Sequence, residues 1–565
     1  MTDNPIATNT PSAGWSLVLE EFVQLPDSTG PFGTTYPRLE HLTSAPGSSD
    51  VFVADQNGVV YRFDPGAASP SPQVFLDVAA NVPGFRNFDS QSGVRGLAFH
   101  PNFATPGADG YRKLYTAHSR DLFTGLFYGP GVTPVIFGSP SGGSDHDSVV
   151  AEWTVDAGGA VIPASYREVM HVTQPLSDHN VGQIGFNPTA GPGDADYGNL
   201  YIAVGDGGGP NDPYNTGQDL TTPHASYLRI NPVQDGASAF QLPAAADPNP
   251  FAVNSDLDDS RNLIYLYGVR NAHRFSWDTD TARMFLYDIG QGVIEEINEG
   301  FRGANYGWDD REGAYTAAGS SNVTPLPPGH PTDAFTYPVA QYDHEGNGLT
   351  GNGAVAGGHV YRGSAVPQLT GLMVFGDFSN NQGPIFAVDV DDLVARDDLT
   401  NLNTFDDGRL APYRQVGLRL AGDAADSSLL DLINDARVSD GEGTFFRTDL
   451  RFGIGPDGEL YVLNKRDGRV RKVVGVVGVP DGDFNRDGVV DLLDFDILAQ
   501  NFGGPGDWGD GNANNDGIID LLDFDVLAQN FGAPGNTQVA AGTVPEPGAV
   551  LTLAAGLALA RRRRR

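Results

Sequence analysis

The sequence RFGIGPDGELYVL at 451–463 has the pattern of a buried strand, a turn built on Pro and Gly, and a second strand. Related phrases occur as GLAFHPNF at 96–103 and QIGFNPTA at 183–190. A strand, turn and strand unit that recurs across the chain favours a radially repeated sheet over a single sandwich. The phrases alone do not give the number of repeats.

Short β-rich runs lie between clusters of Gly, Asp, Asn and Pro throughout 15–474, and we find no long apolar stripe of period 3.6 there. Two of the runs contain tight-turn residues, QNG at 56–58 and RDG at 466–468, which favour hairpins. These patterns predict an antiparallel all-β domain over 15–475, between a leader at 1–14 and a linker at 476–482.

The composition limits the possible partners. The 565 residues include 34 basic and 71 acidic side chains, for a formal net charge of −37. Such a field repels phosphate backbones and favours calcium, so we expect no nucleic-acid partner. The chain has no cysteine, which excludes disulfides, thiolate metal sites and cysteine nucleophiles.

A tandem duplication occupies 483–532, where DLLDFDILAQNFG at 491–503 recurs as DLLDFDVLAQNFG at 520–532. Each copy includes a loop with oxygen-bearing side chains at positions 1, 3, 5, 9 and 12 and Gly at position 6, the spacing of a calcium loop. The predicted ligands, with backbone carbonyls at Val489 and Ile518, are Asp483, Asn485, Asp487, Val489, Asp491 and Asp494, then Asn512, Asn514, Asp516, Ile518, Asp520 and Asp523. Because the second loop begins with a neutral Asn, we expect it to bind calcium more weakly.

Each loop is followed by a short predicted helix with an apolar face, Leu493/Phe495/Leu498 in one copy and Leu522/Phe524/Leu527 in the other. Two such small units can bury these faces only against each other, so calcium should largely decide whether they fold.

The duplication resembles a type I dockerin, a module that docks onto cohesins, which implies a protein partner. Loop positions 10 and 11 are Leu492-Leu493 and Leu521-Leu522, where dockerins usually carry small polar recognition residues. This departure leaves the identity of the partner open.

The C-terminus combines VPEP at 544–547, an apolar run at 548–560 and five arginines at 561–565, after a linker at 533–543. As a helix the apolar run would span only about 20 Å, against about 30 Å for a hydrocarbon core. The order of these parts resembles the PEP-CTERM sorting signal of exosortase systems. The resemblance implies transient membrane anchoring, export and an extracellular or cell-surface location. Residues 1–14 do not read as a signal peptide, so export requires a start further upstream.

Three segments of the β domain concentrate groups that a β core does not need. In SDHNVGQ at 177–183, Asp178 stands beside His179, an imidazole suited to take a proton near neutral pH. In YGVRNAHR at 267–274, Arg270 and Asn271 can bind an anionic or quinone oxygen. In DIGQG at 288–292, a glycine-rich backbone can present carbonyls to calcium. Each segment alone is also typical of an ordinary solvated turn.

Taken in their order along the chain, these segments and the strand phrases resemble the soluble glucose/sorbosone dehydrogenases over nearly all of 36–474. The resemblance implies a six-bladed β-propeller that uses pyrroloquinoline quinone (PQQ) and calcium to oxidise an aldose sugar or a related alcohol. It implies a general base at His179 with Asp178 as its neighbour, and a charge-stabilising Arg270. The implied cofactor and calcium contacts are Gln91, Arg270, Asn271, Gly290, Gln291 and Gly292.

Some positions depart from the family pattern. Asn381 stands where the glucose-oxidising members have a cofactor-binding Lys, and two late arginines have no in-register equivalents, although Arg447 and Arg451 lie close by. Fewer cations would weaken the binding of a tricarboxylated quinone. Two alternatives therefore stay open: a non-catalytic propeller that binds glycans or proteins at the cell surface, and a calcium-dependent hydrolase such as a lactonase.

Overall fold

The computed structural model describes residues 5–6, 10–89, 91–122, 132–319, 322–326, 335–344, 353–378, 382–394 and 410–533. The chain divides into two compact units, Met1–Gly475 and Val476–Arg565. The predicted sorting tail, the arginines at 561–565 and Asn381 lie outside the described residues. Within the described part, no helix is long and apolar enough to span a bilayer.

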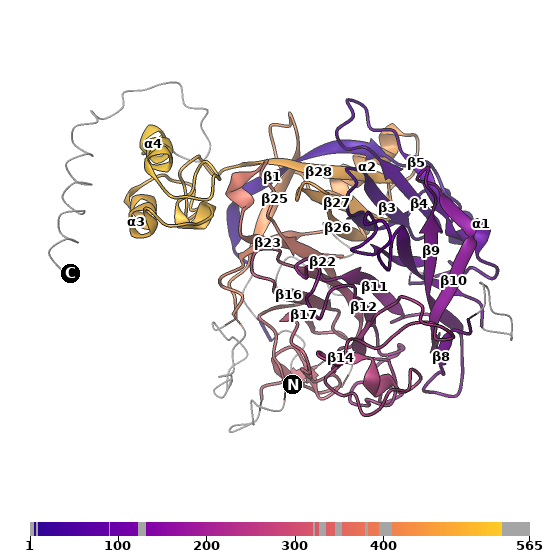
Figure 1. Ribbon diagram of the computed structural model, residues 1–565. Coiled ribbons are helices and arrows are strands. Elements are labelled where there is room, and N and C mark those ends of the chain that lie inside the picture. Colours follow the sequence, from indigo (N-terminus) through magenta and orange to yellow (C-terminus); the bar gives the residue numbers. More distant parts are fainter. Residues whose placement is uncertain are drawn as a thin grey trace. The chain divides into compact units, whose positions relative to one another are not determined.

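The larger unit is mostly β, as the sequence predicts, with sheets of twelve, five, four, four and three strands (Figure 1). Dividing the 12-stranded sheet at its two parallel pairings, β25 with β1 and β26 with β2, gives six consecutive sets of main strands. The first three sets are β2 (Leu39–Ser44), β3 (Val51–Asp55), β4 (Val59–Phe63), β5 (Gln73–Asp77); β6 (Val94–Phe99), β7 (Lys113–Arg120), β9 (His146–Val155), β10 (Val161–Gln174), β8 (Val135–Phe137); and β11 (Val181–Phe186), β12 (Leu200–Val204), β13 (Ser226–Ile230), β14 (Ile264–Tyr267).

The other three sets are β15 (Ala272–Trp277), β16 (Met284–Asp288), β17 (Ile294–Glu299), β21 (Ala340–Asp343); β22 (Val355–Val360), β23 (Leu372–Asp377), β24 (Ile385–Asp389), β25 (Arg414–Leu420); and β26 (Leu450–Ile454), β27 (Leu460–Asn464), β28 (Arg469–Val477), β1 (Ser12–Gln24). A small sheet of β18 (Arg311–Glu312), β19 (Tyr315–Ala317) and β20 (Val323–Thr324) lies between β17 and β21 in the sequence.

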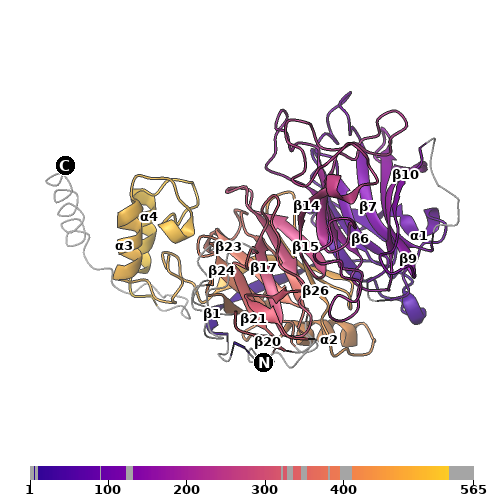
Figure 2. The same ribbon diagram turned by 90° about the horizontal axis from the view of Figure 1, so that it is seen from below.

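The first strands of the six sets lie next to one another. Strand β2 contacts β6, β6 contacts β11, β11 contacts β15, β15 contacts β22, β22 contacts β26, and β26 pairs with β2 in parallel. Figure 2 shows β6, β15 and β26 near one another in the interior of this unit. Residues at the starts of these first strands are therefore brought together from all along the chain.

Apolar side chains between neighbouring sets explain why whole strands are buried. All five residues of β3 are buried, and Phe52 from this strand contacts Phe75 and Phe99 with ring centroids 4.8 and 4.6 Å apart. Strands covered on both faces read as continuous apolar runs, and such runs are found here.

Both predicted hairpins are confirmed. Asp55 Oδ1 accepts the Asn57 N–H at 2.9 Å, and Gly58, with φ of 120°, completes the turn between β3 and β4. The second turn, at 466–468, joins β27 to β28.

Two features differ from the expectation. Strand β1 begins at Ser12, so it includes residues that we assigned to the leader. A helix, α2 (Leu429–Ser439), also occurs within the β unit, besides the single turn α1 (Val78–Asn81). Ser428 caps α2 by accepting the Asp431 N–H, a local signal that is independent of any long apolar stripe.

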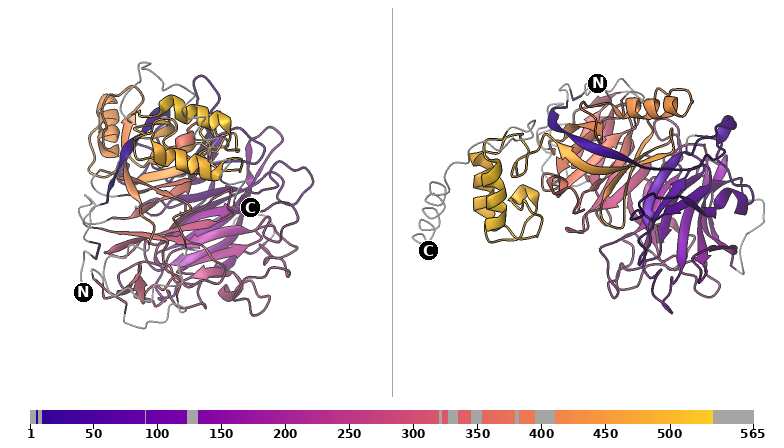
Figure 3. Two further views of the ribbon diagram at one scale, coloured as in Figure 1. Left: turned by 90° about the vertical axis from the view of Figure 1, so that its left-hand side faces the viewer. Right: turned by 90° about the horizontal axis from the view of Figure 1, so that it is seen from above.

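The smaller unit contains two helices of matching length, α3 (Leu492–Asn501) and α4 (Leu521–Asn530) (Figure 3). Both begin with a capping box, and Phe495 and Phe524 contact each other across the two helices at 6.1 Å. Leu498 and Leu527 are buried, as predicted. Leu493 and Leu522, which we expected in the packed face, are both 57% exposed, because the buried helix positions are Asp494 and Leu498 in α3 and Asp523 and Leu527 in α4.

Candidate functional site

His179 lies just before β11 and is held in an unusual backbone conformation. Its φ is +52°, a left-handed value that costs a non-glycine residue about 1 kcal/mol or more. The Gln91 side chain accepts the His179 N–H at 3.0 Å and fixes this conformation. Gly205 allows the facing loop to approach, since a Cβ there would lie 2.5 Å from the His179 carbonyl oxygen.

The carboxylate that orients His179 is Asp206. His179 Nδ1 lies 2.6 Å from Asp206 Oδ1, whereas His179 Nε2 lies 3.9 Å from Asp178 Oδ2. The Asp178 side chain is 44% exposed and the Asp206 side chain is fully buried. Asp206, and not the sequence neighbour Asp178, is therefore the carboxylate that can fix the tautomer of His179, because the ring lies against the loop after β12.

The surroundings of Asp206 favour its ionised form. Its Oδ1 also accepts the Gly208 N–H, and its Oδ2 accepts the Trp308 indole N–H, both at 2.9 Å. Burial alone would raise the pKa of Asp206, but its interactions with His179 and Arg270 outweigh burial and lower that pKa. A carboxylate at Nδ1 keeps the ring proton there and leaves Nε2 as the basic nitrogen.

Arg270 joins the same cluster from the start of β15. The Asp206 N–H donates to the Arg270 carbonyl at 2.8 Å, and the Arg270 guanidinium lies 5.5 Å from the centre of the Trp308 ring. The backbone N–H groups of Arg270 and Asn271 donate to the two oxygens of Asp288, each at 2.8 Å. His179 and Arg270, 91 positions apart, thus meet through Asp206 and Trp308.

The glycine turn at 288–292 is also present, but its carbonyls face Arg270 where we expected a calcium ion. Arg270 Nη1 donates to the carbonyls of Ile289 and Gly290 at 3.1 and 2.7 Å. The N–H groups of Gln291 and Gly292 both donate to one oxygen of Glu312 at 3.0 Å. These carbonyls face a guanidinium, so a calcium ion at the same oxygens would have to compete with Arg270.

The Gln291 side chain likewise serves a structural contact. Its Nε2 donates to Asn211 Oδ1 at 3.0 Å, and its Oε1 accepts the Asn211 N–H. Gln291 therefore ties the turn to the loop after β12, and this loop carries Asp206.

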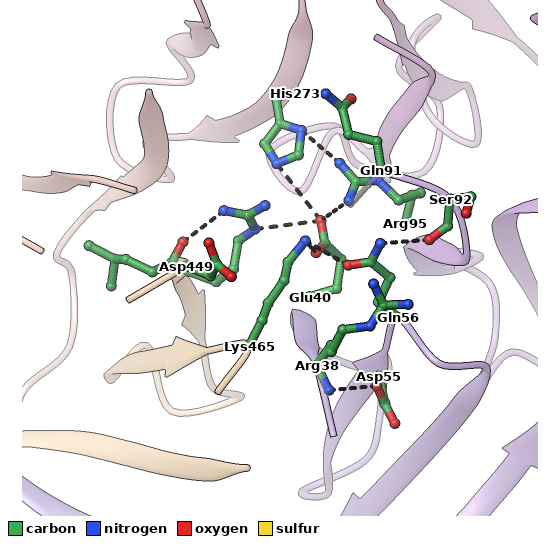
Figure 4. A network of polar contacts seen from close by, with 12 residues as sticks. Arg38, Glu40, Asp55, Gln56, Gln91, Ser92, Arg95, His273, Asp449 and Lys465 are labelled. Atoms are coloured by element: carbon green, nitrogen blue, oxygen red, sulfur yellow. Dashed lines mark hydrogen bonds and ion pairs between the residues drawn. The ribbon is translucent and has the colours of Figure 1, made fainter. Parts of the chain in front are cut away.

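A second polar cluster lies at the starts of the other first strands (Figure 4). Glu40 on β2 is fully buried and pairs with several cations. We call this set the Glu40 cluster; it consists of Glu40, Arg95 of β6, Arg274 of β15, Arg451 of β26 and Lys465 after β27. Arg447 and Arg451, noted above only as nearby arginines, both stack on Phe378 at 4.6 Å.

The first of the duplicated loops directs its first and last carboxylates, Asp483 and Asp494, inward. Asp483 Oδ2 accepts the Gly488 N–H at 2.8 Å, and Asp494 Oδ1 accepts the Phe484 N–H at 2.8 Å. Both side chains are buried, and burial, together with repulsion from Asp494, raises the pKa of Asp483 to about 6. Among the described residues, no three or more His, Asp or Glu side chains are grouped closely enough to hold a metal ion.

Sequence reasoning missed two residues of the His179 cluster. Asp206 is followed by three glycines in GDGGG at 205–209, a sign of close backbone approach after a strand. Trp308 ends the phrase NYGW at 305–308, and nothing in that phrase indicates a role for its indole N–H.

Comparison with known proteins identifies related chains. The HIPL1 protein of Arabidopsis thaliana is 27% identical over 428 residues, which cover 67% of this chain and 55% of that protein. The HIPL2 protein of the same plant is 28% identical over 383 residues, which cover 61% and 51%. The chain therefore spans about half the length of the curated relatives it matches.

Solved structures with similar folds have low sequence identity. The PQQ-bound aldose sugar dehydrogenase of Streptomyces coelicolor is 18% identical, with 82% of this chain and 99% of that chain covered and a TM-score of 0.46. The apo-form of the soluble aldose sugar dehydrogenase of Escherichia coli is 17% identical, with 80% and 98% covered and a TM-score of 0.46.

A protein-family model described as glucose / sorbosone dehydrogenase matches residues 40–404. This segment contains His179, Asp206, Arg270 and Trp308. Since the match covers more than half of the sequence, the chain belongs to the glucose/sorbosone dehydrogenase family.

Proposed function

We propose that this chain is an exported dehydrogenase that oxidises an aldose sugar or a related alcohol, with PQQ and calcium as cofactors. The observation that carries the proposal is the 2.6 Å contact between His179 Nδ1 and the buried Asp206 carboxylate, beside Arg270 and Trp308. Family membership supports an oxidoreductase of this type.

His179 would act as the general base. With its proton held on Nδ1 by Asp206, the free Nε2 can accept the hydroxyl proton of the substrate as the carbon gives up a hydride. The buried Asp206 carboxylate would then stabilise the imidazolium that forms. The quinone, when bound, would supply the hydride acceptor.

The residues around His179 fit an anionic quinone and a hard cation in chemical type. Arg270 offers guanidinium donors, the buried Asn271 offers an amide, and the carbonyls of Ile289 and Gly290 offer oxygen ligands. Binding calcium at these carbonyls would release the Arg270 guanidinium for the ligand. We therefore propose Arg270 as the residue that stabilises negative charge on the bound ring.

The finer architecture is part of the same proposal. The strands form six sets, and the first strand of each set contacts the first strand of the next set. This arrangement supports a six-bladed β-propeller. The starts of those first strands would then border the central channel of such a fold.

For the smaller unit we propose a dockerin-like calcium module that binds a protein partner, followed by a sorting tail. The duplicated loops, the paired helices and the buried carboxylates Asp483 and Asp494 support calcium binding. Its exposed leucines at loop positions 10 and 11 favour a partner with an apolar surface.

The proposal is tested with purified full-length protein, calcium, PQQ and an artificial redox dye. We expect dye reduction with at least one member of a panel of aldoses and polyols, and none when PQQ is omitted. Saturation with PQQ without turnover of any substrate would contradict a dehydrogenase and would favour a non-catalytic glycan or protein binder. Hydrolysis of a lactone without PQQ would identify a hydrolase instead.

A further inference from the structure

The Glu40 cluster contains more positive charge than its carboxylate can neutralise. Three guanidinium groups share one oxygen: Glu40 Oε1 lies 3.0 Å from Arg95 Nη1 and 3.5 Å from Arg451 Nε, and it also accepts a hydrogen bond from Arg274. Glu40 Oε2 pairs with Lys465. Four cations therefore surround one carboxylate.

All five side chains of the cluster are buried. Glu40 is fully buried, and the exposed fractions of Arg95, Arg274, Arg451 and Lys465 are 3%, 7%, 3% and 4%. Arg95 Nε and Arg451 Nε have no hydrogen-bond acceptor among the described residues. Excess charge and unmade hydrogen bonds in a buried place are both costly, and an added anion would relieve both.

The neutral partners in the cluster do not balance the charge. Lys465 Nζ donates to Gln56 Oε1 at 2.7 Å, and Arg95 Nη2 lies 2.9 Å from His273 Nδ1. Burial and the nearby cations hold the pKa of His273 well below its usual range, so this imidazole adds no charge. Burial, together with the charges of Arg451 and Arg95, lowers the pKa of Lys465 against the opposing effect of the Glu40 and Asp449 carboxylates.

The cluster adjoins the His179 site. Gln91, whose side chain accepts the His179 N–H, lies beside Arg95 and His273 in Figure 4. On the other side, the Arg451 guanidinium and the Lys465 ammonium lie 4.6 and 5.8 Å from the centre of the Phe378 ring. Cations next to an aromatic face form a suitable surface for a flat, negatively charged molecule.

We propose that the Glu40 cluster is a binding site for an organic polyanion, in which Arg95, Arg451 and Lys465 neutralise its carboxylates beside His179. The identity of the ligand rests on the proposed function: it would be PQQ, and cations from two different strand sets would then replace those absent at Asn381 and at the late arginine positions. A polycarboxylate substrate or effector would present the same chemistry.

The first experiment uses citrate as the probe and tests whether an added polyanion stabilises the Glu40 cluster. We expect citrate to raise the melting temperature of the full-length protein by several degrees relative to sodium chloride at equal ionic strength. Lys465→Met should remove this shift. Lys472→Met, which deletes a lysine paired at 3.0 Å with Asp457 near the surface, should retain it. If neither citrate nor PQQ stabilises the wild-type protein, the anion site is refuted.

Titration with PQQ then separates this inference from the proposed function. We expect Lys465→Met to weaken PQQ binding at least tenfold in calorimetry and to reduce its salt dependence, with Lys472→Met unchanged. Turnover of a sugar by wild-type protein, combined with unaltered PQQ affinity in Lys465→Met, would refute the site and leave the function standing. Tight PQQ binding that depends on Lys465, without turnover of any sugar, would support the anion site and refute the dehydrogenase function.

A second variant covers the possibility that Lys465→Met does not fold. Gln56→Glu places an internal carboxylate against Lys465 without deleting a cation. It should preserve folding and still weaken citrate and PQQ binding, because the excess charge is then neutralised from within. Unchanged affinity in a folded Gln56→Glu protein would contradict the proposal.

Discussion

The His179 cluster and the duplicated loops use carboxylates in opposite ways. In the larger unit, Asp206 is one buried carboxylate that bonds to His179 of its own strand set and to Trp308, which lies between β17 and β18. In the smaller unit, Asp483 and Asp494 belong to one stretch of twelve residues and repel each other. The first arrangement orients a base, whereas the second stores repulsion that a cation can relieve.

This difference predicts that the His179 cluster determines turnover and that the loop carboxylates determine stability. Loss of a partner in the His179 cluster should reduce turnover and leave the fold intact. Loss of a loop carboxylate should reduce stability and leave turnover intact.

The largest expected effect comes from the base itself. His179→Gln should lower the rate of sugar-dependent dye reduction by about 10³-fold, since general-base catalysis contributes about 10²–10⁴. The melting temperature and PQQ affinity should change little, because the ring makes only one strong contact. A rate within tenfold of wild type would remove His179 from the mechanism.

The next effect sharpens the choice between the two aspartates. Asp206→Asn should lower the rate by about 10²-fold or more, because an amide can hold the wrong tautomer of His179. Asp178→Asn, its matched control, should stay within about threefold of wild type, since its carboxylate is exposed and 3.9 Å from the ring. Equal losses in the two variants would contradict the assignment of Asp206.

Calcium removal should affect the other unit. Chelation should lower or abolish the thermal transition of 476–533 in calorimetry of the full chain, by about 4 kcal/mol if calcium had been present at a thousandfold excess over its Kd. Asp483→Ala should mimic chelation, whereas Asp496→Ala, at an exposed helix position, should not. A transition that is insensitive to calcium would exclude these loops as calcium sites.

A smaller effect concerns pH and buried acids near the glycine turn. Burial, together with the neighbouring Asp288 charge, raises the pKa of Glu296 from 4.5 to about 8. Its contribution to stability is fully present below the unfolded-state pKa and is lost as pH rises through the folded-state value, so the melting temperature should fall by a few degrees between about pH 5 and 9. Glu296→Gln should flatten this fall, and Glu20→Gln, at an exposed position, should leave it unchanged.

The smallest effect tests the packing of the duplicated repeats. Trp508 is buried, donates its indole N–H to the Asp483 carbonyl at 2.9 Å and contacts Phe484 at 5.6 Å. Trp508→Phe keeps an aromatic ring and loses the hydrogen bond, so the smaller unit should lose about 1 kcal/mol of stability. Retention of full stability would mean that this bond does not link the two repeats.

Local patterns in the sequence predicted the local structure well. The strand runs, the two hairpins and the paired helices depend on neighbouring residues, and all are present in the structure. The exposure of Leu493 and Leu522 was not predictable from the apolar pattern, since packing between two helices decides which turn is covered.

The sequence by itself determined the all-β class of the larger unit, the duplication, and the residues His179 and Arg270 as chemically distinctive. These depend on composition, spacing and order along the chain. Only the tertiary structure decided that Asp206 replaces Asp178 as the partner of His179, that Arg270 occupies the carbonyls of the glycine turn, and that four cations meet at Glu40. The reason is physical: hydrogen bonds and charge pairs act over a few ångströms in space, and the contacts between first strands bring together residues that the chain separates by hundreds of positions.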